Sequence, residues 1–397
     1  MGQPVRKVIK DTHPNMDIKP FYTLLVDGNS LLRVCFKDDK INSKGEHYGA
    51  IFQFLLQIKI MLQKKDFDYI FVVFDNHHSG ILRYNIYNDY KANRDKDYIT
   101  CSEELGEYGK AYEAKLKQMQ EYLFNKNKPK REKSDVEKFV DENFARERDT
   151  LLKYFNELYV RWMFHDKVEG DDLIAYYCLH KKNEEKIVIM TSDQDLTQLI
   201  TDSVCLYDVR KHKFISQKNI IKEKGVPVEN VLIEKVLCGD TSDNIKNIDG
   251  VSVTRLHELI PEIEKRPVTI EEVKERAQKC IDERIANKKK PLKWHENIVN
   301  GVTRGNYDGD FYEINTKIID LKNPLLTEDA IEEIESIMYA TQDPEGRSFS
   351  NLYQYILEDS IEELKSETKF ASFFNEFKRF VDKEIKRFKD ENKNKVK

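Results

Sequence analysis

The sequence has no uninterrupted apolar run approaching the ~18 residues of a membrane span, so a membrane protein is not expected. Its six cysteines form no CxxC pair, which is typical of single core or surface thiols and predicts a reducing, cytoplasmic setting. The first residues contain no apolar signal core. They also miss the myristoylation pattern, because Arg6 stands where Ser or Thr is needed.

Several common catalytic motifs are absent as well. The chain has no GxxxxGK[ST] loop, no GxGxxG after a strand, no HExxH and no GxSxG, which argues against the enzyme classes that depend on them. No His/Cys cluster with zinc-ligand spacing occurs, and His77-His78 are interpreted as loop residues. The chain has 397 residues, a length typical of two to three domains. It is 40% hydrophobic and 35% charged, and this hydrophobic content is enough for a sizeable core.

Strands and helices alternate in the N-terminal two-thirds of the chain. Short apolar, β-branched runs predict buried parallel strands at 22–27, 69–75, 186–193 and 204–208. A helix is expected over 50–64, and from Glu229 onward the pattern is all-helical, with a C-terminal helical segment at about 328–380 and a frayed, solvated tail after it. The fold class is therefore α/β, with a doubly wound parallel sheet that binds ligands beyond the carboxyl ends of its strands.

Acidic residues fall at the ends of the first three predicted strands. Asp27 closes the first strand, Asp75 the second, and Asp193 and Asp195 follow the third. A single Asp there would often be a helix cap, but three strand ends of this kind lie on one edge of a parallel sheet and can converge.

Two further segments add acids. Glu169, Asp171 and Asp172 crowd the first turn of a predicted helix, where one or two acids would suffice to compensate the helix dipole. Asp240 and Asp243 lie in CGDTSDNI, which alone would be an ordinary capping turn. Nine carboxylates brought together require cations, and hard oxygen ligands select Mg²⁺ or Mn²⁺. The acids favour phosphoryl chemistry with two metal ions.

With these residues in place, the chain resembles the 5′ nuclease superfamily of flap endonucleases and 5′→3′ exonucleases, and within it looks most similar to the T-even phage ribonuclease H group. The matching segments are LLVDGNS, FVVFDNHHSG, YNDYKANR, VEGDDLIA, TSDQDLTQL and CGDTSDNI followed by NIDGVSVTRL. The resemblance implies a parallel-sheet, PIN-like core over 1–225 with a helical arch at about 83–150. It also implies a helical duplex-binding domain over 226–397 that contains a helix-three-turn-helix.

The resemblance also implies residue roles. Asp27, Asp75, Glu169, Asp171 and Asp172 would hold or position one Mg²⁺, and Asp193, Asp195, Asp240 and Asp243 a second, with Mn²⁺ able to substitute. Lys91 and Arg94 would stabilise the charged phosphate, Tyr90 would stack on an unpaired base unless it is a core or surface aromatic, and Arg83 would meet the single strand. Gly250 would permit a tight turn that contacts phosphate, whereas Ser252 replaces a family Gly and argues against a K⁺ site.

The resulting hypothesis is a monomeric, metal-dependent 5′ nuclease that removes flaps and RNA primers in lagging-strand replication, in the host cytoplasm if phage-encoded. Its partners would be branched or nicked DNA, RNA:DNA duplexes, and a single-strand-binding protein or clamp. The alternatives are a PIN-type endoribonuclease and a catalytically inactive DNA-junction-binding replication factor.

The net charge of −5 argues mildly against nucleic acid, but it depends on the site acids. Taking the nine from the 71 acidic residues leaves 62, fewer than the 66 basic residues. The basic stretches 126–133 and 287–293, and more weakly the tail after Phe380, are then expected to face phosphates, with salt-sensitive binding.

Overall fold

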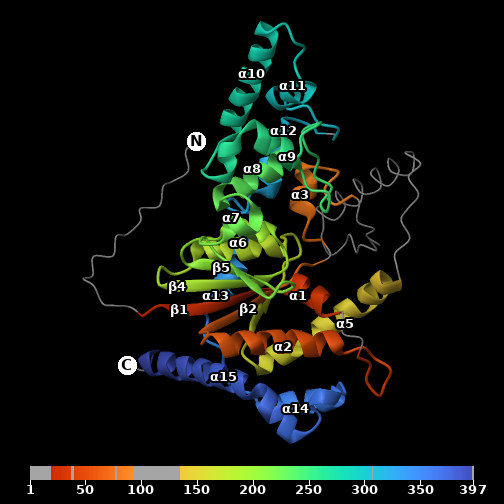
Figure 1. The fold of residues 1–397 in the computed structure, drawn as a ribbon. Helices are drawn as coiled ribbons and strands as arrows, with labels where there is room; N and C mark the ends of the chain where they lie inside the picture. Colours follow the sequence, from red (N-terminus) through yellow and green to blue (C-terminus); the bar gives the residue numbers. More distant parts are fainter. Residues whose placement is uncertain (1–18, 37–39, 77, 93–134, 306, 396–397) are drawn as a thin grey trace.

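A six-stranded sheet forms the centre of the molecule, with strand order β3-β2-β1-β4-β5-β6 (Figure 1). The computed structural model describes residues 19–36, 40–76, 78–92, 135–305 and 307–395. The strands are β1 Phe21–Asp27, β2 Tyr69–Val73, β3 Arg161–Met163, β4 Glu185–Thr191, β5 Val204–Asp208 and β6 Lys213–Ile215. Strands β1 to β5 pair in parallel, and β6 pairs antiparallel with β5.

The strand order reverses direction at β1. This strand pairs with β2 on one side and with β4 on the other, so that Val26 lies opposite both Val72 and Met190. The chain builds β2 and β3 outward on the first side, then returns to build β4 and β5 on the second. In open α/β sheets the crevice at such a reversal, beyond the carboxyl ends of the strands, is where ligands bind.

The four predicted strands are confirmed, but two are shorter than expected. β2 ends two residues before Asp75 and β4 two residues before Asp193, so these acids lie in loops beyond the sheet edge. Strands β3 and β6 were not predicted from the sequence, because three residues are too few to show a strand period.

Helices cover both faces of the sheet. One face packs against α1 Gly28–Cys35, α2 Gly49–Lys64, α5 Asp135–Glu157, α14 Phe349–Glu358 and α15 Glu367–Lys395. The other packs against α6 Gly170–His180, α13 Glu328–Met338, and Ile220 at the start of α7 Ile220–Lys224. Burial of large side chains such as Phe54, Phe74 and Phe377 drives this packing, at about 1.5–3 kcal/mol each.

A third hydrophobic core lies above the sheet and belongs to the helical part of the chain (Figure 1). It includes Tyr87 and Tyr90, continues from Val226, and is built mainly by α8 Val228–Cys238, α9 Val253–Leu259, α10 Ile270–Ala286, α11 Lys293–Asn300 and α12 Phe311–Ile319. The long helix α10 and its neighbour α11 project away from the sheet. Short helix α3 Ile81–Ile86 and the 3₁₀ turns η1 Asp195–Leu199, η2 Pro261–Glu264 and η3 Glu362–Leu364 complete the elements.

The C-terminal helices do not extend this third core. Instead α13 packs on one face of the sheet and α14 and α15 on the other. Of the expected region 226–397, therefore, only about the first half forms the separate helical core, and the two-domain division itself stays a prediction. The expected frayed tail is corrected, because α15 continues as a helix to Lys395. Among the described helices none is long and apolar enough to cross a membrane.

Candidate metal centre

Asp27 stands where the sheet order reverses and connects its two halves. It is the last residue of β1 and the N-cap of α1, and its Oδ1 accepts a hydrogen bond from the Ser30 amide at 2.9 Å. Its Oδ2 accepts one from the hydroxyl of Thr191, the last residue of β4, at 2.6 Å. The strand-end position predicted from the sequence is thus fixed by a cap on one side and a neighbouring strand on the other.

Asp75 connects β2 to the start of α6. Its Oδ1 accepts the Gly170 amide at 2.6 Å, and its Oδ2 accepts the Asn29 side-chain amide at 3.2 Å. A Cβ on Gly170 would lie 3.1 Å from Asp75 Oδ1, closer than side chains normally approach. Glycine at this position therefore lets the first turn of α6, with its three acids, reach the edge of the sheet.

Several of these carboxyl groups hold protons unusually tightly. Burial, with smaller contributions from neighbouring carboxylates, raises the pKa of Asp27 to about 7 and that of Asp193 to about 6. Burial, followed by the charges of Asp193, Asp27 and Asp75, raises the pKa of Asp171 well above its usual range. The charge of Asp193 raises the pKa of Asp171, and the charge of Asp195 raises the pKa of Asp193. Asp193 therefore lies near acids of both sets. Such a cluster favours bound cations, which would offset both burial and repulsion.

Arg83 contacts acids of the first set. Its guanidinium is buried and bonds both carboxylate oxygens of Asp172, one of them at 3.0 Å from Nη2. Nη1 also lies 2.7 Å from Glu169 Oε2. The structure thus places Arg83 against two acids, and its contact with a single strand stays a prediction.

Asp172 is held by the same arginine, and its predicted part in holding or positioning an ion stays a prediction. Its carboxylate is 1% exposed, bonds Arg83 through both oxygens and accepts the Leu325 amide at 3.0 Å. These contacts allow it to position the first turn of α6 through Arg83. Three acids in one helical turn therefore serve two different purposes.

Tyr90 and Lys91 both meet Glu169 at the edge of the site. The buried Tyr90 hydroxyl donates to Glu169 Oε2 at 3.0 Å, and the Lys91 ammonium pairs with Glu169 Oε1. Of the two interpretations of Tyr90, the structure supports the core aromatic, because its ring is 6% exposed and cannot stack on a base as it stands. Arg94 and the basic stretch 126–133 lie outside the described residues.

The second set of acids is built by a tight loop after α8. Paired backbone hydrogen bonds of 2.8 Å between Asp240 and Ile245 close this loop. Gly239 begins it with φ +72°, and a Cβ there would lie 2.6 Å from the Ile245 carbonyl, so no other residue fits. The loop carries Asp240 and Asp243 to Asp195, and one oxygen of each lies within 4.8 Å of the others.

Lys235 is the functional candidate that sequence reasoning missed. From α8 its ammonium reaches Asp195 Oδ2, and it lies 2.7 Å from Asp240 Oδ2. Lys235 and hydrogen bonds from Ser242 lower the pKa of Asp240 to about 2 despite partial burial. In the sequence, the only signal for the contact between Lys235 and Asp240 is that Lys235 lies five residues before Asp240. Such a spacing is common in charged helices.

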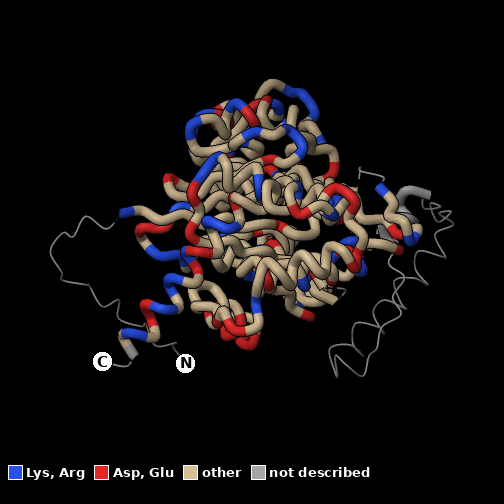
Figure 2. The backbone as a smooth tube through the Cα atoms, turned by 90° about the horizontal axis from the view of Figure 1, so that it is seen from below, with Lys and Arg blue, Asp and Glu red and all other residues tan. Residues whose placement is uncertain are grey.

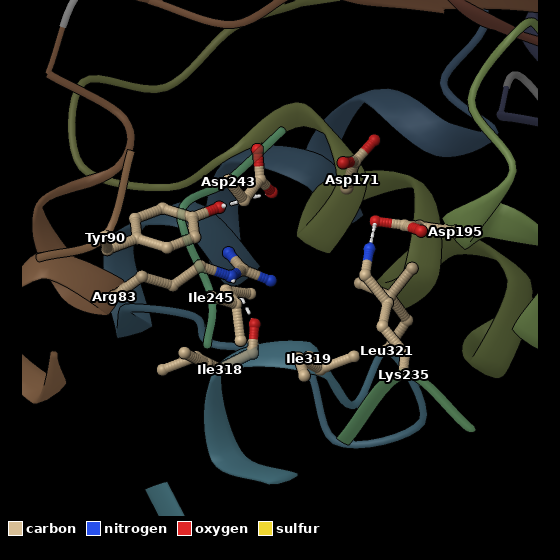
Figure 3. A pocket seen from close by; sticks show the side chains of 10 residues that line it. All are labelled: Arg83, Tyr90, Asp171, Asp195, Lys235, Asp243, Ile245, Ile318, Ile319 and Leu321. Atoms are coloured by element: carbon tan, nitrogen blue, oxygen red, sulfur yellow. Dashed lines mark hydrogen bonds and ion pairs between the residues drawn. The ribbon is translucent and has the colours of Figure 1, made fainter. Parts of the chain in front are cut away.

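One acid of the first set and two of the second line a common pocket (Figure 3). Asp171, Asp195, Asp243 and Lys235 line it from different elements, and isoleucine and leucine side chains form its lower side in the view. The lining residues are Arg83, Tyr90, Asp171, Asp195, Lys235, Asp243, Ile245, Ile318, Ile319 and Leu321. Converging carboxylate oxygens of this kind are the ligands that Mg²⁺ and Mn²⁺ prefer, so the residues present fit a divalent ion.

In the turn between α8 and α9, three backbone carbonyl groups accept hydrogen bonds from side chains of the protein. Arg255 Nη1 lies 2.5 Å from the Gly250 carbonyl oxygen, and Asn247 and Asn297 donate to the carbonyls of Val251 and Asp249 at 2.7 and 2.8 Å. Gly250 adopts φ +83°, as the tight turn requires, and Ser252 caps α9. Three carbonyl oxygens that could have faced a K⁺ ion thus already have donors. The prediction against a K⁺ site and the predicted phosphate contacts both stay predictions.

A search among known proteins finds the same family. The family model described as "5'-3' exonuclease, N-terminal resolvase-like domain" matches residues 22–225, just over half of the chain. The DNA polymerase I of Bacillus subtilis is 23% identical over 272 residues, which are 66% of this chain and 26% of the polymerase. A 5′-3′ exonuclease of Buchnera aphidicola is 24% identical over 235 residues, which are 58% of this chain and 66% of the relative.

A solved structure shares the fold. The flap endonuclease of bacteriophage T5, in a pseudo-enzyme–product complex with DNA and metal ions, superposes with a TM-score of 0.50 at 17% identity, covering 85% of this chain and 99% of that one. The resemblance inferred from the motifs is thereby confirmed for the superfamily, while the narrower likeness to T-even phage ribonuclease H stays a prediction. The residues matched, and the sheet with its acidic edge, show that this chain belongs to the 5′-3′ exonuclease family.

Proposed function

We propose that the chain is a metal-dependent 5′ nuclease that hydrolyses phosphodiesters at 5′ ends, at flaps and in RNA primers paired to DNA. The observation that carries this proposal is the meeting of Asp195, Asp240 and Asp243, whose oxygens lie within 4.8 Å of one another, beside a pocket that Asp171 at the start of α6 also lines. Membership of the 5′-3′ exonuclease family supports the same chemistry.

Two Mg²⁺ ions, replaceable by Mn²⁺, are proposed to bind here. Asp27, Asp75 and Asp171 would hold the first, and Asp195, Asp240 and Asp243 the second, with Asp193 between them. When bound, such ions lower the pKa of an attacking water and offset the charge on the leaving oxygen. Glu169 and Asp172 contribute through Arg83, which keeps the first turn of α6 in place.

Lys91 is proposed to stabilise the negative charge that develops on the scissile phosphate. Its backbone amide donates to the Asp243 carbonyl at 2.8 Å, which ties this segment to the second set of acids. Its side chain is 13% exposed, and its ammonium pairs with Glu169 at the edge of the site. Fixed positive groups at the point where charge develops are often the largest contribution to rate. Arg94 follows three residues later and is proposed to act with it.

The substrates proposed are branched or nicked DNA and RNA:DNA duplexes, with the segment α8–α9 contacting the duplex. A monomer in the cytoplasm, or in a host cytoplasm, that cooperates with a single-strand-binding protein or clamp remains part of this proposal. A PIN-type endoribonuclease and an inactive junction-binding factor are the alternatives. The α8–α9 segment argues against the first, and the complete set of nine acids against the second.

Digestion of a 5′-labelled flap substrate in Mg²⁺, with EDTA as the control, tests the function directly. The expected products are short labelled oligonucleotides cut near the single-strand/duplex junction, and EDTA is expected to abolish them. A parallel digestion of a 5′-recessed RNA:DNA duplex measures primer removal, and single-stranded RNA tests the endoribonuclease alternative. If neither the flap nor the RNA:DNA duplex is cut in Mg²⁺, the proposal is wrong.

A further inference from the structure

We infer that Lys235 is a built-in counter-ion of the second carboxylate cluster, which a divalent ion must displace in order to bind. In the metal-free protein its ammonium holds Asp195 and Asp240 together. When the ion takes those oxygens, the ammonium moves into the pocket, where a substrate phosphate can receive it. The inference rests on the proposed function, because it assigns the second cluster to a metal ion.

The contacts of Lys235 support the first part of this inference. The ammonium bonds Asp195 and lies 2.7 Å from Asp240 Oδ2, and these are two of the three acids whose oxygens lie within 4.8 Å of one another. The Lys235 side chain is 13% exposed, against 18% for Asp240 and 30% for Asp195, so the pairs are partly shielded from water. Asp243, the third acid, is instead approached by the Tyr90 hydroxyl at 3.4 Å.

Displacement follows from charge and geometry. A divalent ion at ~2.0–2.1 Å from the oxygens of Asp195 and Asp240 would bring two positive charges against the ammonium. At separations of about 4 Å such repulsion is large in a partly buried site. The lysine has a flexible four-carbon stem, and Lys235 also lines the pocket that Asp171 and Asp243 line (Figure 3). The ammonium therefore has space to turn toward the position that a phosphate would occupy.

Two consequences distinguish this arrangement from a simple ion pair. The second site binds its ion more weakly than three carboxylates alone would, because each binding event must break two ion pairs. The displaced charge then favours an incoming phosphate, so substrate and second ion should strengthen each other's binding. Such coupling restricts full loading of the site to the substrate complex.

Calorimetric titration of the DNA-free protein with Mn²⁺ tests the inference. Lys235→Met keeps the length of the side chain and removes its charge, so the weaker class of Mn²⁺ sites is expected to bind about tenfold more tightly or better. Lys222→Met, an exposed lysine on α7, is the charge-matched control and is expected to change the affinity less than about twofold. Without metal, Lys235→Met is also expected to melt at a lower temperature, a loss that Mn²⁺ should reverse.

Unchanged or weaker Mn²⁺ binding by Lys235→Met would overturn the inference, since the lysine would then support the metal site rather than compete with it. If that variant does not fold, Lys235→Gln and amine labelling of Lys235 in the unaltered protein replace it. Mn²⁺ is expected to increase the labelling, and equal labelling with and without Mn²⁺ would contradict displacement. None of these measurements requires cleavage. If the protein cuts flaps but gives the contradicting results, this inference is wrong and the proposed function stands.

Discussion

At the scale of single residues, neighbouring aspartates of the site make different contacts. Asp171 and Asp172 are neighbours at the start of α6, yet Asp171 faces the pocket and Asp172 bonds Arg83. The sequence predicted that both acids belong to the site. It did not predict that Asp172 bonds Arg83 while Asp171 lines the pocket. This difference depends on which direction each side chain takes from the helix, and on a guanidinium almost ninety residues away in the chain.

Lys91 gives the first prediction at this scale. Lys91→Ala removes a positive charge from the edge of the site, so the single-turnover rate of flap cleavage is expected to fall about 10²-fold or more. Binding of the same flap in Ca²⁺ is expected to change less than about threefold. Glu169 retains Arg83 and Tyr90 as partners, so the variant should fold.

Lys91→Arg is the matched variant, because it keeps the charge and should recover part of the rate. Rapid-quench measurement with enzyme in excess separates the chemical step from product release. An unchanged single-turnover rate in Lys91→Ala would remove this lysine from the reaction.

At the scale of elements, helix α15 is held to the sheet by a buried ion pair. Arg161 of β3 bonds Glu384 of α15 through two nitrogens at 2.7 and 3.1 Å, and it donates to the Ala340 carbonyl at 2.6 Å. Arg161 is 4% exposed and Glu384 is fully buried. This pair, with the phenylalanines of α15, fixes the C-terminal helix against the core.

Glu384→Ala would leave the Arg161 guanidinium buried without its carboxylate. The free energy of unfolding is expected to fall by about 3–5 kcal/mol, because an uncompensated buried charge is costly. Glu376→Ala, on the same helix, breaks an ion pair with the exposed Arg379 and is expected to cost no more than about 1 kcal/mol. Urea denaturation followed by circular dichroism measures both, and equal losses would show that the pair has no special role.

Some helices and strands were predictable from the sequence and others were not, for physical reasons. Strands such as β1 and β5 were found because they are continuous apolar runs, and α2 because its apolar face spans sixteen residues. Strand β3 was missed because its three residues begin with Arg161, whose charge is satisfied only by the distant Glu384. The C-terminal helices were predicted as helices, but a helical pattern does not reveal which face of which sheet it covers.

At the scale of the whole molecule, charge is distributed unequally between its two ends. The turn joining α10 and α11 projects from the helical core and carries exposed Lys288, Lys289 and Lys290 (Figure 1). At the opposite end, seen from below in Figure 2, the segment leading to the C-terminus interleaves basic and acidic residues. The prediction that 287–293 faces phosphate therefore favours the α10–α11 end over the tail.

Replacing Lys288, Lys289 and Lys290 with Gln is expected to weaken binding of forked DNA in Ca²⁺. The slope of log affinity against log salt should decrease by about 0.9 for each phosphate that these lysines no longer neutralise. The matched control replaces three exposed lysines of α15, Lys378, Lys386 and Lys389, with Gln. Fluorescence anisotropy across a salt series measures both sets. Equal effects would show that binding responds only to net charge.

The central claim is that the clustered carboxylates perform metal-dependent cleavage rather than maintain the fold. Comparison of flap cleavage in Mg²⁺ with forked-DNA binding in Ca²⁺, for Asp195→Asn and for the exposed control Asp202→Asn, tests it most directly. Asp195→Asn is expected to lose cleavage by about 10²-fold or more while its binding stays within about threefold, and Asp202→Asn to match the unaltered protein. Equal loss of cleavage and binding in Asp195→Asn, or full cleavage by it, would contradict the claim.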